Sequence, residues 1–278
     1  MACVDPKARL GTGVRVEAFA RIEGDVSIGD YCTVRSGAVI RAGVRAGCHN
    51  EFCEHAVIGG PPQHAARPTD TGRVEIGDHN VFREGVTIHL ALKPENTTRV
   101  GDHNYIMAGG HLGHDVVLGN HVIFANGSML GGHVTVEDRA FISGGVAVHQ
   151  FCRVGRLAMV GGHARVVQDI PPYMMVDGIS GCIVGLNTVG IRRSGHTTAE
   201  INDLKAAYRV IYRHGLAWRD VIATLREEFA EGPASSLAEF LAKGTRGFAQ
   251  ERRGPATPTI KLRIPDEDEP VVLRAKAG

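Results

Sequence analysis

Residues 22–40 read IEGDVSIGDYCTVRSGAVI and carry an aliphatic residue at every sixth position, beginning with Ile22. The same six-residue period extends back to Val4 and, after interruptions, forward to Val166. A compact residue usually follows each aliphatic residue by four positions, as Ala38 follows Val34. A period of six fits neither an α-helix nor a heptad, but it suits a flat strand and a corner repeated three times per coil. The sequence therefore predicts a mainly β protein built as a parallel β-helix, with aliphatic residues pointing inward and Gly, Asn or Asp tolerating the turns.

Two insertions break the period, at 59–73 (GGPPQHAARPTDTGR) and at 89–99 (HLALKPENTTR). Insertions in a solenoid leave its corners as loops, and such loops commonly border a binding site. We expect residues 1–190 to form the β-helix with these two corner loops.

The repeat stops after residues 170–172, and helical periodicity replaces it. We expect an α-helical domain over 191–250, with helices at 198–214, 217–229 and 235–242. Residues 251–278 are rich in proline and charge, and we expect this tail to be disordered.

Composition excludes several classes of protein. Among 278 residues the formal net charge is only +1, which argues against a nucleic-acid partner because phosphate neutralisation requires an excess of positive charge. No apolar stretch approaches the roughly 18 to 20 residues that would cross a bilayer, and the repeat begins too early to leave room for a signal peptide. We therefore expect a cytoplasmic protein without membrane insertion, whose six cysteines are reduced packing residues.

Stacking the coils predicts a functional site. Residues 18 apart should lie directly above one another, so the hexads that begin at 112, 130 and 148 form one column. Besides Gln150, this column collects several of the fourteen histidines, namely His111, His114, His133 and His149. The histidines at 79, 103 and 121 also occupy equivalent positions, and we interpret these as surface turn residues without a role.

Imidazoles with pKa values near neutrality serve as metal ligands or as general bases. A zinc-dependent β-helical hydratase is one reading, although the spacing differs from that of known enzymes of this kind. His114 is followed directly by Asp115, as a base with an orienting carboxylate would be, so we favour a general base with no metal and no cofactor. A non-catalytic scaffold or nucleotide-sugar binder is a third hypothesis, but a scaffold would have no reason to align a His-Asp pair with other histidines in one column.

The motifs of this column resemble those of a known family. AGGHLGHDVVLGN (108–120), LGGH (130–133), AVHQFC (147–152), VQDIPPY (167–173) and GLNTVGIRR (185–193) are similar to UDP-N-acetylglucosamine O-acyltransferases, over about residues 3 to 250. The resemblance implies a left-handed β-helix, a homotrimer with sites between neighbouring prisms, and transfer of an (R)-3-hydroxyacyl chain from acyl carrier protein to the sugar 3-hydroxyl, the first step of lipid A synthesis.

The resemblance also implies residue roles. His114 would remove the proton from the attacking hydroxyl with support from Asp115, and the backbone N–H of Gly132 would stabilise the thioester oxyanion. Arg193 would approach phosphate and Asn187 the uracil. The other residues expected to bind the UDP-sugar or the acyl group are His111, His133, His149, Gln150 and Gln63. Gly162 and its neighbour leave a side-chain-free strip suited to an acyl chain, although ordinary turn glycines explain them nearly as well.

The chain departs from the family pattern in its two loops. Where the family carries Gln-Asp-x-Lys, this chain has Gln63 followed by HAAR (64–67), and HLAL (89–92) replaces His-Arg-Gly-Thr. Val189 stands where the family has a glutamate near the nucleotide base. These changes leave N-acylation of a 3-amino UDP-sugar as an alternative, unless Arg67 replaces the missing lysine. The related step that N-acylates a glucosamine nucleotide fits less well, because it generally requires an additional N-terminal uridine-binding domain.

Overall fold

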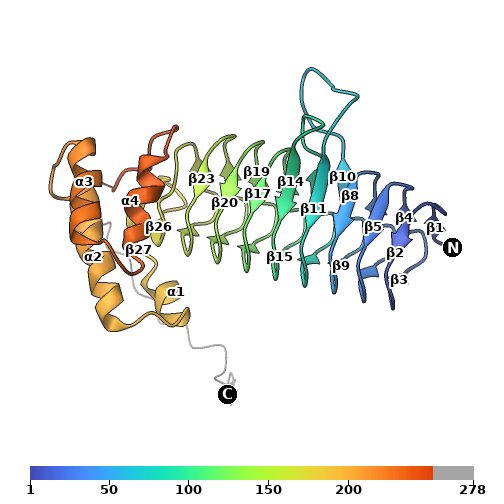
Figure 1. Cartoon of the computed structure of the whole chain (residues 1–278), viewed down its shortest axis with the longest axis horizontal. Coiled ribbons are helices and arrows are strands. Elements are labelled where there is room, and N and C mark those ends of the chain that lie inside the picture. The colour runs from blue at the N-terminus through green and yellow to red at the C-terminus, as the bar shows by residue number, and fades with distance from the viewer. Residues whose placement is uncertain (253–278) are drawn as a thin grey trace, which may run out of the picture.

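The computed structural model describes residues 1–252, and they form a three-sided prism of short parallel strands followed by helices (Figure 1). The first sheet contains β1 (Cys3–Val4), β4 (Arg21–Ile22), β7 (Val39–Ile40), β10 (Val57–Gly60), β13 (Thr87–His89), β16 (His111–Leu112), β19 (Met129–Leu130), β22 (Ala147–Val148) and β25 (Arg165–Val166). The second contains β2 (Arg9–Leu10), β5 (Val26–Ile28), β8 (Val44–Ala46), β11 (Arg73–Ile76), β14 (Thr97–Val100), β17 (Val117–Leu118), β20 (Thr135–Val136) and β23 (Arg153–Val154). The third contains β3 (Arg15–Val16), β6 (Thr33–Val34), β9 (Glu51–Phe52), β12 (Val81–Phe82), β15 (Tyr105–Ile106), β18 (Ile123–Phe124), β21 (Phe141–Ile142), β24 (Met159–Val160), β26 (Met174–Val176) and β27 (Ile183–Leu186).

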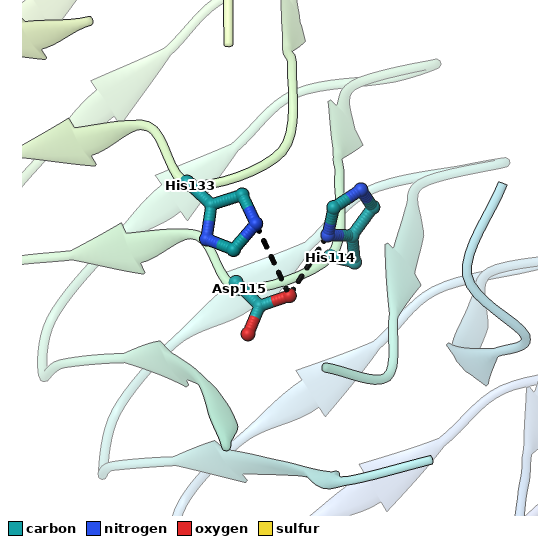
Figure 2. A group of neighbouring side chains, drawn as sticks. All are labelled: His114, Asp115 and His133. Atoms are coloured by element: carbon teal, nitrogen blue, oxygen red, sulfur yellow. Dashed lines mark hydrogen bonds and ion pairs between the residues drawn. The ribbon is translucent and has the colours of Figure 1, made fainter. Parts of the chain in front are cut away.

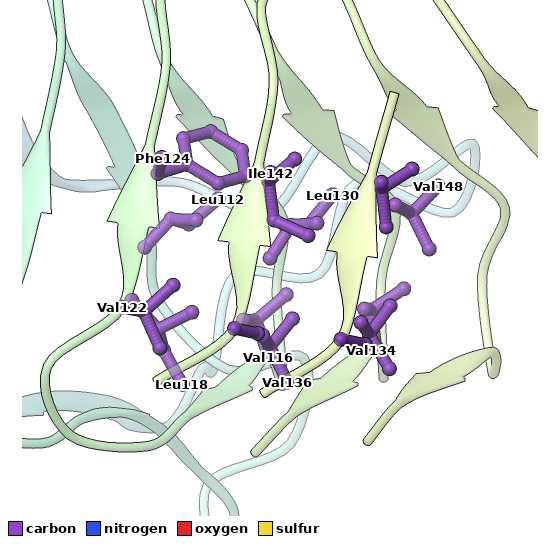
Figure 3. Packing of buried hydrophobic residues seen from close by; sticks show 14 of the residues in the cluster. Leu112, Val116, Leu118, Val122, Phe124, Leu130, Val134, Val136, Ile142 and Val148 are labelled. Atoms are coloured by element: carbon purple, nitrogen blue, oxygen red, sulfur yellow. The ribbon is translucent and has the colours of Figure 1, made fainter. Parts of the chain in front are cut away.

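The strands stack in the register that the period predicts. Leu112 pairs with Leu130 and Leu130 with Val148, each 18 residues apart. These side chains point into the prism and are buried against the branched residues of the other two sheets (Figure 3). Burial of such side chains contributes roughly 1.5 to 3 kcal/mol each. The core is a continuous column of aliphatic contacts with few aromatic rings.

The corners differ from the expectation in one respect. Gly77 and Gly101 of the Gly-Asp turns do not have a positive φ, and the left-handed residues of these corners are histidines at 79 and 103, with φ of 58° and 57°. A Cβ at Gly77 would lie 1.9 Å from Oδ1 of Asp102 in the next coil, so glycine is required there for close approach. At this corner the glycine therefore serves close packing between coils, whereas other corner glycines, such as Gly37 and Gly109, do adopt a positive φ.

The two insertions leave the prism between the first and second sheets. Residues 61–72 connect β10 to β11, and residues 90–96 connect β13 to β14. They lengthen two coils, so that Val74 pairs with Val44 across 30 residues and Thr87 with His111 across 24. Both loops thus stand at the corner that follows the first sheet.

Helices cover the C-terminal end of the prism, while the first coil at the N-terminal end is open (Figure 1). The helices are α1 (Thr188–Arg193), α2 (Thr198–Tyr212), α3 (Trp218–Glu228) and α4 (Ser235–Ala242). Thr197 and Glu200 form a capping box that begins α2. The sequence did not predict α1, or β27, which turns back antiparallel to β26.

The tail expected from residue 251 onward falls mainly on 253–278, outside the described residues. Glu251 itself accepts a hydrogen bond from Tyr208 Oη at 2.7 Å. Within the described part of the chain, no helix is long and apolar enough to cross a membrane.

Candidate active site

A pocket of about 550 Å³ lies at the corner between the first and second sheets, beside the first loop. Its walls come from strands β13, β16, β19 and β22, from the turns that follow the last three, and from the loop that connects β10 to β11. The lining residues include Gln63, His64, His89, His111, His114, Gly132, His149 and Gln150. The structure therefore brings six of the predicted site residues to one cavity.

His114 and Asp115 form a hydrogen-bonded pair at the pocket wall (Figure 2). Nδ1 of His114 lies 2.8 Å from Oδ2 of Asp115, and both side chains are nearly buried. With Nδ1 engaged by the carboxylate, the imidazole keeps Nε2 as its free basic atom. This is the arrangement of a general base with an orienting carboxylate.

The second loop holds Asp115 in place. Its carboxylate accepts hydrogen bonds from the Leu92 N–H at 2.9 Å and the Asn96 amide at 2.7 Å, while the backbone N–H of Asp115 donates to Thr98 Oγ1. Burial alone raises the pKa of Asp115, but the N–H of Leu92, the ring of His114 and the amide of Asn96 outweigh it, so the carboxyl pKa lies below its ordinary value. The carboxylate is therefore ionised near neutral pH.

Gly132 lies directly beneath the His114 ring. A Cβ at this position would be 2.5 Å from Cε1 and 2.6 Å from Nε2 of His114, distances that real Cβ atoms do not adopt. No acceptor within residues 1–252 takes the N–H of Gly132. Glycine here both makes room for the base and leaves a backbone donor next to it.

His89 and His111 form the deeper wall of the pocket. Their rings meet edge to face at 4.8 Å, and Thr87 Oγ1 lies 2.8 Å from His111 Nδ1. Burial lowers the pKa of both rings, and for His89 burial together with His111 and His114 lowers it to about 4. Nδ1 of His89 is buried and has no hydrogen-bond partner within the described residues. His89 lines the pocket, and the 18-residue stacking of the sequence had not identified it.

The low pKa of His89 predicts an acid-dependent loss of stability. Between pH 6.5 and about 4 the unfolded chain binds a proton at His89 and the folded chain does not, so the free energy of unfolding decreases as the pH falls through this window. We expect this residue to contribute about 2 kcal/mol of the loss between pH 7 and pH 4.5. Guanidinium denaturation at both pH values should show a smaller loss for His89→Asn than for the unmodified protein. An unchanged loss would contradict the shifted pKa, and His214→Asn, which replaces an exposed histidine, serves as the control.

His133 completes the cluster from the next coil. Its Nε2 lies 3.8 Å from Oδ2 of Asp115, and its ring meets that of His114 edge to face at 5.1 Å (Figure 2). Burial lowers the pKa of His133 despite the opposing effect of Asp115. Within residues 1–252, His114, Asp115 and His133 are also the one group of three whose ligand atoms all lie within 4.8 Å, close enough to hold a metal ion.

Of the five predicted site residues absent from the pocket lining, Asp115 and His133 adjoin His114, and the other three lie apart. Asn187 caps α1, where its side chain accepts from the Gly190 N–H and donates to Leu157 O. Arg193 is exposed in the last turn of α1, and Gly162 is exposed at the corner between the third and first sheets. No hydrogen bond, ion pair or ring contact within residues 1–252 joins these residues to His114.

Other residues at the site escaped the sequence analysis. Arg246, from the segment after α4, lies 3.1 Å from His149 Nδ1, and His64 of the first loop approaches His114 edge to face at 6.1 Å. The 18-residue stacking could not find them, because they come from outside the regular coils. Position 64 had been noted only as a departure from the family pattern.

Comparisons with known proteins identify what the chain is similar to. The family described as UDP-N-acetylglucosamine O-acyltransferase, domain 2, matches residues 169–249, and the bacterial transferase hexapeptide family matches 7–42 and 97–132. An acyl-[acyl-carrier-protein]–UDP-N-acetylglucosamine O-acyltransferase from Halorhodospira halophila is 40% identical over 89% of this chain and 96% of its own, and one from Herminiimonas arsenicoxydans is 38% identical over 86% and 91%.

Solved structures of UDP-N-acetylglucosamine acyltransferases are also similar to this chain. A UDP-N-acetylglucosamine acyltransferase from Bacteroides fragilis superposes with a TM-score of 0.86 at 34% identity, covering 90% of this chain and 98% of its own. The corresponding enzyme from Campylobacter jejuni gives 0.84 at 32%, with the same coverage. These matches confirm the predicted fold class, a left-handed parallel β-helix with a C-terminal α-helical part.

Proposed function

The chain belongs to the UDP-N-acetylglucosamine O-acyltransferase family, and on this premise we propose that it transfers an (R)-3-hydroxyacyl group from acyl carrier protein to the 3-hydroxyl of UDP-N-acetylglucosamine, the first step of lipid A biosynthesis. The observation that carries the proposal is the His114–Asp115 pair set over Gly132 in the pocket. A thioester is already activated, so positioning, one base and one oxyanion donor suffice for the reaction.

In the proposed reaction Nε2 of His114 takes the proton of the sugar hydroxyl as its oxygen attacks the thioester carbonyl. The carbonyl oxygen becomes negatively charged, and the unused N–H of Gly132 donates to it. The tetrahedral intermediate then collapses, the C–S bond breaks, and His114 returns the proton to the departing sulfur. The negative charge of Asp115 stabilises the imidazolium while it holds the proton.

The remaining residues of the pocket would orient the substrates. Gln63, His111, His149 and Gln150 of the lining, and His133 beside His114, offer hydrogen-bonding groups for the nucleotide sugar or the acyl chain. The lowered pKa values of His111 and His133 keep these rings neutral near pH 7, so each can both donate and accept. We assign Gly162 to the path of the acyl chain, Arg193 to phosphate and Asn187 to the uracil, all three contributed across a subunit interface.

Asp115→Asn tests the role of the carboxylate. An asparagine keeps the shape of the side chain but removes the charge that stabilises protonated His114. We expect kcat/KM to fall about 10- to 100-fold, less than the full contribution of a general base. Steady-state kinetics would measure this loss. A rise in KM with kcat unchanged would contradict the role, because the loss would then lie in substrate binding.

A direct assay tests the proposed reaction. Purified protein would be incubated with hydroxyacyl carrier proteins of several chain lengths and UDP-N-acetylglucosamine, and the product identified by mass spectrometry. We expect an ester at the 3-hydroxyl, formed equally well in the presence of a chelator. Absence of product at every chain length would refute the proposal, and activity that requires added zinc would favour the metal-dependent alternative.

A 3-amino UDP-sugar is a second candidate acceptor. His64 occupies the loop position where the family pattern has an acidic residue, and its ring lies 6.1 Å from that of His114. The acceptor end of the pocket therefore differs chemically from the family pattern while the base and the oxyanion donor are retained. Competition between the two sugars in one assay distinguishes O-acylation from N-acylation.

The homotrimer is part of the proposal. Several outward-facing residues of the third sheet are apolar, and Ile123 among them is 38% exposed in the single chain. On the first sheet, Met129 is 48% exposed. Such faces favour association of prisms side by side, which would set α1 of one subunit near the pocket of the next. Light scattering should give a mass three times the 29.7 kDa of the chain. We place the enzyme in the cytoplasm, where thiols such as buried Cys32 and Cys152 stay reduced.

A further inference from the structure

A second group of histidines forms a ladder along the corner between the second and third sheets, the corner preceding β9, β12, β15 and β18. His49, His79, His103 and His121 come from four successive coils and are exposed. Their rings are parallel within 2°, with centroids 4.7 to 4.8 Å apart. The sequence analysis noted the equivalent positions of three of them and interpreted them as surface turn residues without a role, and it did not predict the stacking of their rings.

Apart from Tyr31, whose ring stacks on His49 with centroids 5.2 Å apart, the ladder has no stacking partner within residues 1–252. None of its four rings forms a hydrogen bond or ion pair within residues 1–252. Each residue also adopts a left-handed conformation, with φ between 55° and 58°, which among residues other than glycine is commonest for Asn, Asp and His. Four exposed imidazoles are thus held in one row by the backbone, with their ring nitrogens available to solvent.

Fixed carboxylates lie beside the ladder. Asp78 and Asp102 immediately precede two of its histidines, and each uses Oδ1 to accept a backbone N–H from the preceding coil, at 2.6 and 2.7 Å. Neither forms an ion pair with a basic side chain of the described chain. The second oxygen of each carboxylate therefore leaves uncompensated negative charge near the imidazoles, which attracts cations.

We propose that this ladder binds divalent transition-metal ions of the imidazole-preferring class, such as Ni²⁺, Zn²⁺ or Cu²⁺, each ion held by two adjacent histidines. Metal–nitrogen bonds of about 2.0 to 2.1 Å require the two donor atoms to approach more closely than the stacked rings do. Exposed side chains can tilt to achieve this. The site is distinct from the catalytic pocket, which lies at the corner between the first and second sheets.

Adjacency, rather than the number of histidines, decides the expected binding. The intact ladder offers two independent pairs, His49 with His79 and His103 with His121. His49→Asn/His121→Asn leaves one pair, His79 with His103. His79→Asn/His121→Asn leaves no adjacent pair, although it also retains two histidines. Asparagine suits these positions because it tolerates the left-handed conformation.

Calorimetric titration of the three full-length proteins with NiCl₂ tests the proposal. Ladder-bound Ni²⁺ should fall from two ions per chain to one and to none, above a background from the pocket cluster that all three share. Losing an adjacent partner should weaken binding by at least about 10- to 100-fold, the effect that loss of an outer-shell contact alone can have. Equal Ni²⁺ uptake by the two double variants, or by all three proteins, would overturn the proposal. Unchanged circular dichroism and metal-free acyl transfer establish that the variants are folded.

Discussion

Replacing His114 with asparagine is expected to lower kcat/KM for acyl transfer by about 10² to 10⁴, the usual contribution of a positioned general base. Nε2 of His114 is the free basic atom of the pair with Asp115, and no other imidazole of the pocket lies within hydrogen-bond distance of this carboxylate. Asparagine leaves the coil geometry intact but supplies no base. The loss should appear in kcat, while binding of the UDP-sugar persists.

Steady-state kinetics and equilibrium binding of the nucleotide sugar measure the two effects separately. His214→Asn is the matched control, because it makes the same histidine-to-asparagine change at an exposed position just after α2. If His114→Asn retains activity within a few-fold of the unmodified enzyme, another group must remove the proton. Loss of binding without loss of kcat would make His114 a substrate ligand instead.

Replacing Gly132 with alanine is expected to lower kcat by about 100-fold or more. The added Cβ would lie within 2.6 Å of two atoms of the His114 ring, so the ring must move. A displacement of about 1 Å in a catalytic group can cost roughly 100-fold, and an altered oxyanion donor costs about as much. The strain falls on the side chain of the base rather than on the core, so the protein should remain folded.

Gly144→Ala provides the control for this substitution. A Cβ at that corner would meet its nearest heavy atom at 3.5 Å, an ordinary contact, and the residue lies outside the pocket. We expect Gly144→Ala to retain activity, and a crystal structure of Gly132→Ala to show the His114 ring displaced. Full activity of Gly132→Ala would mean that neither ring placement nor the adjacent N–H limits the rate.

Sequence periodicity predicted the part of the site that regular coils build. Leu112, Leu130 and Val148 stack as expected because equal coil lengths bring every eighteenth residue into register. His114 and His133 follow from that register, and the predicted base and carboxylate are in fact hydrogen-bonded neighbours. A strict solenoid turns a one-dimensional spacing into spatial proximity, which few folds permit.

The same reasoning failed where the coil length changes. The 18-residue spacing could not place His89 beside His111, because the second insertion lengthens the spacing between Thr87 and its partner His111 to 24 residues. Arg246 arrives from beyond α4, and the Asn96 amide that holds Asp115 belongs to a loop with no period at all. Such contacts depend on tertiary packing, and no local pattern encodes them.

The open first coil determines where the prism should begin to unfold. Val4 and Leu10 keep 40% and 36% of their surface exposed, whereas the helices bury the last coils. In a solenoid each repeat is stabilised only by its neighbours, so the amide protons of the first coils should exchange with solvent soonest and protection should rise toward the capped end. Hydrogen exchange would then reveal a polarity of unfolding that runs from the N-terminal coils toward the catalytic ones, leaving the pocket intact until late.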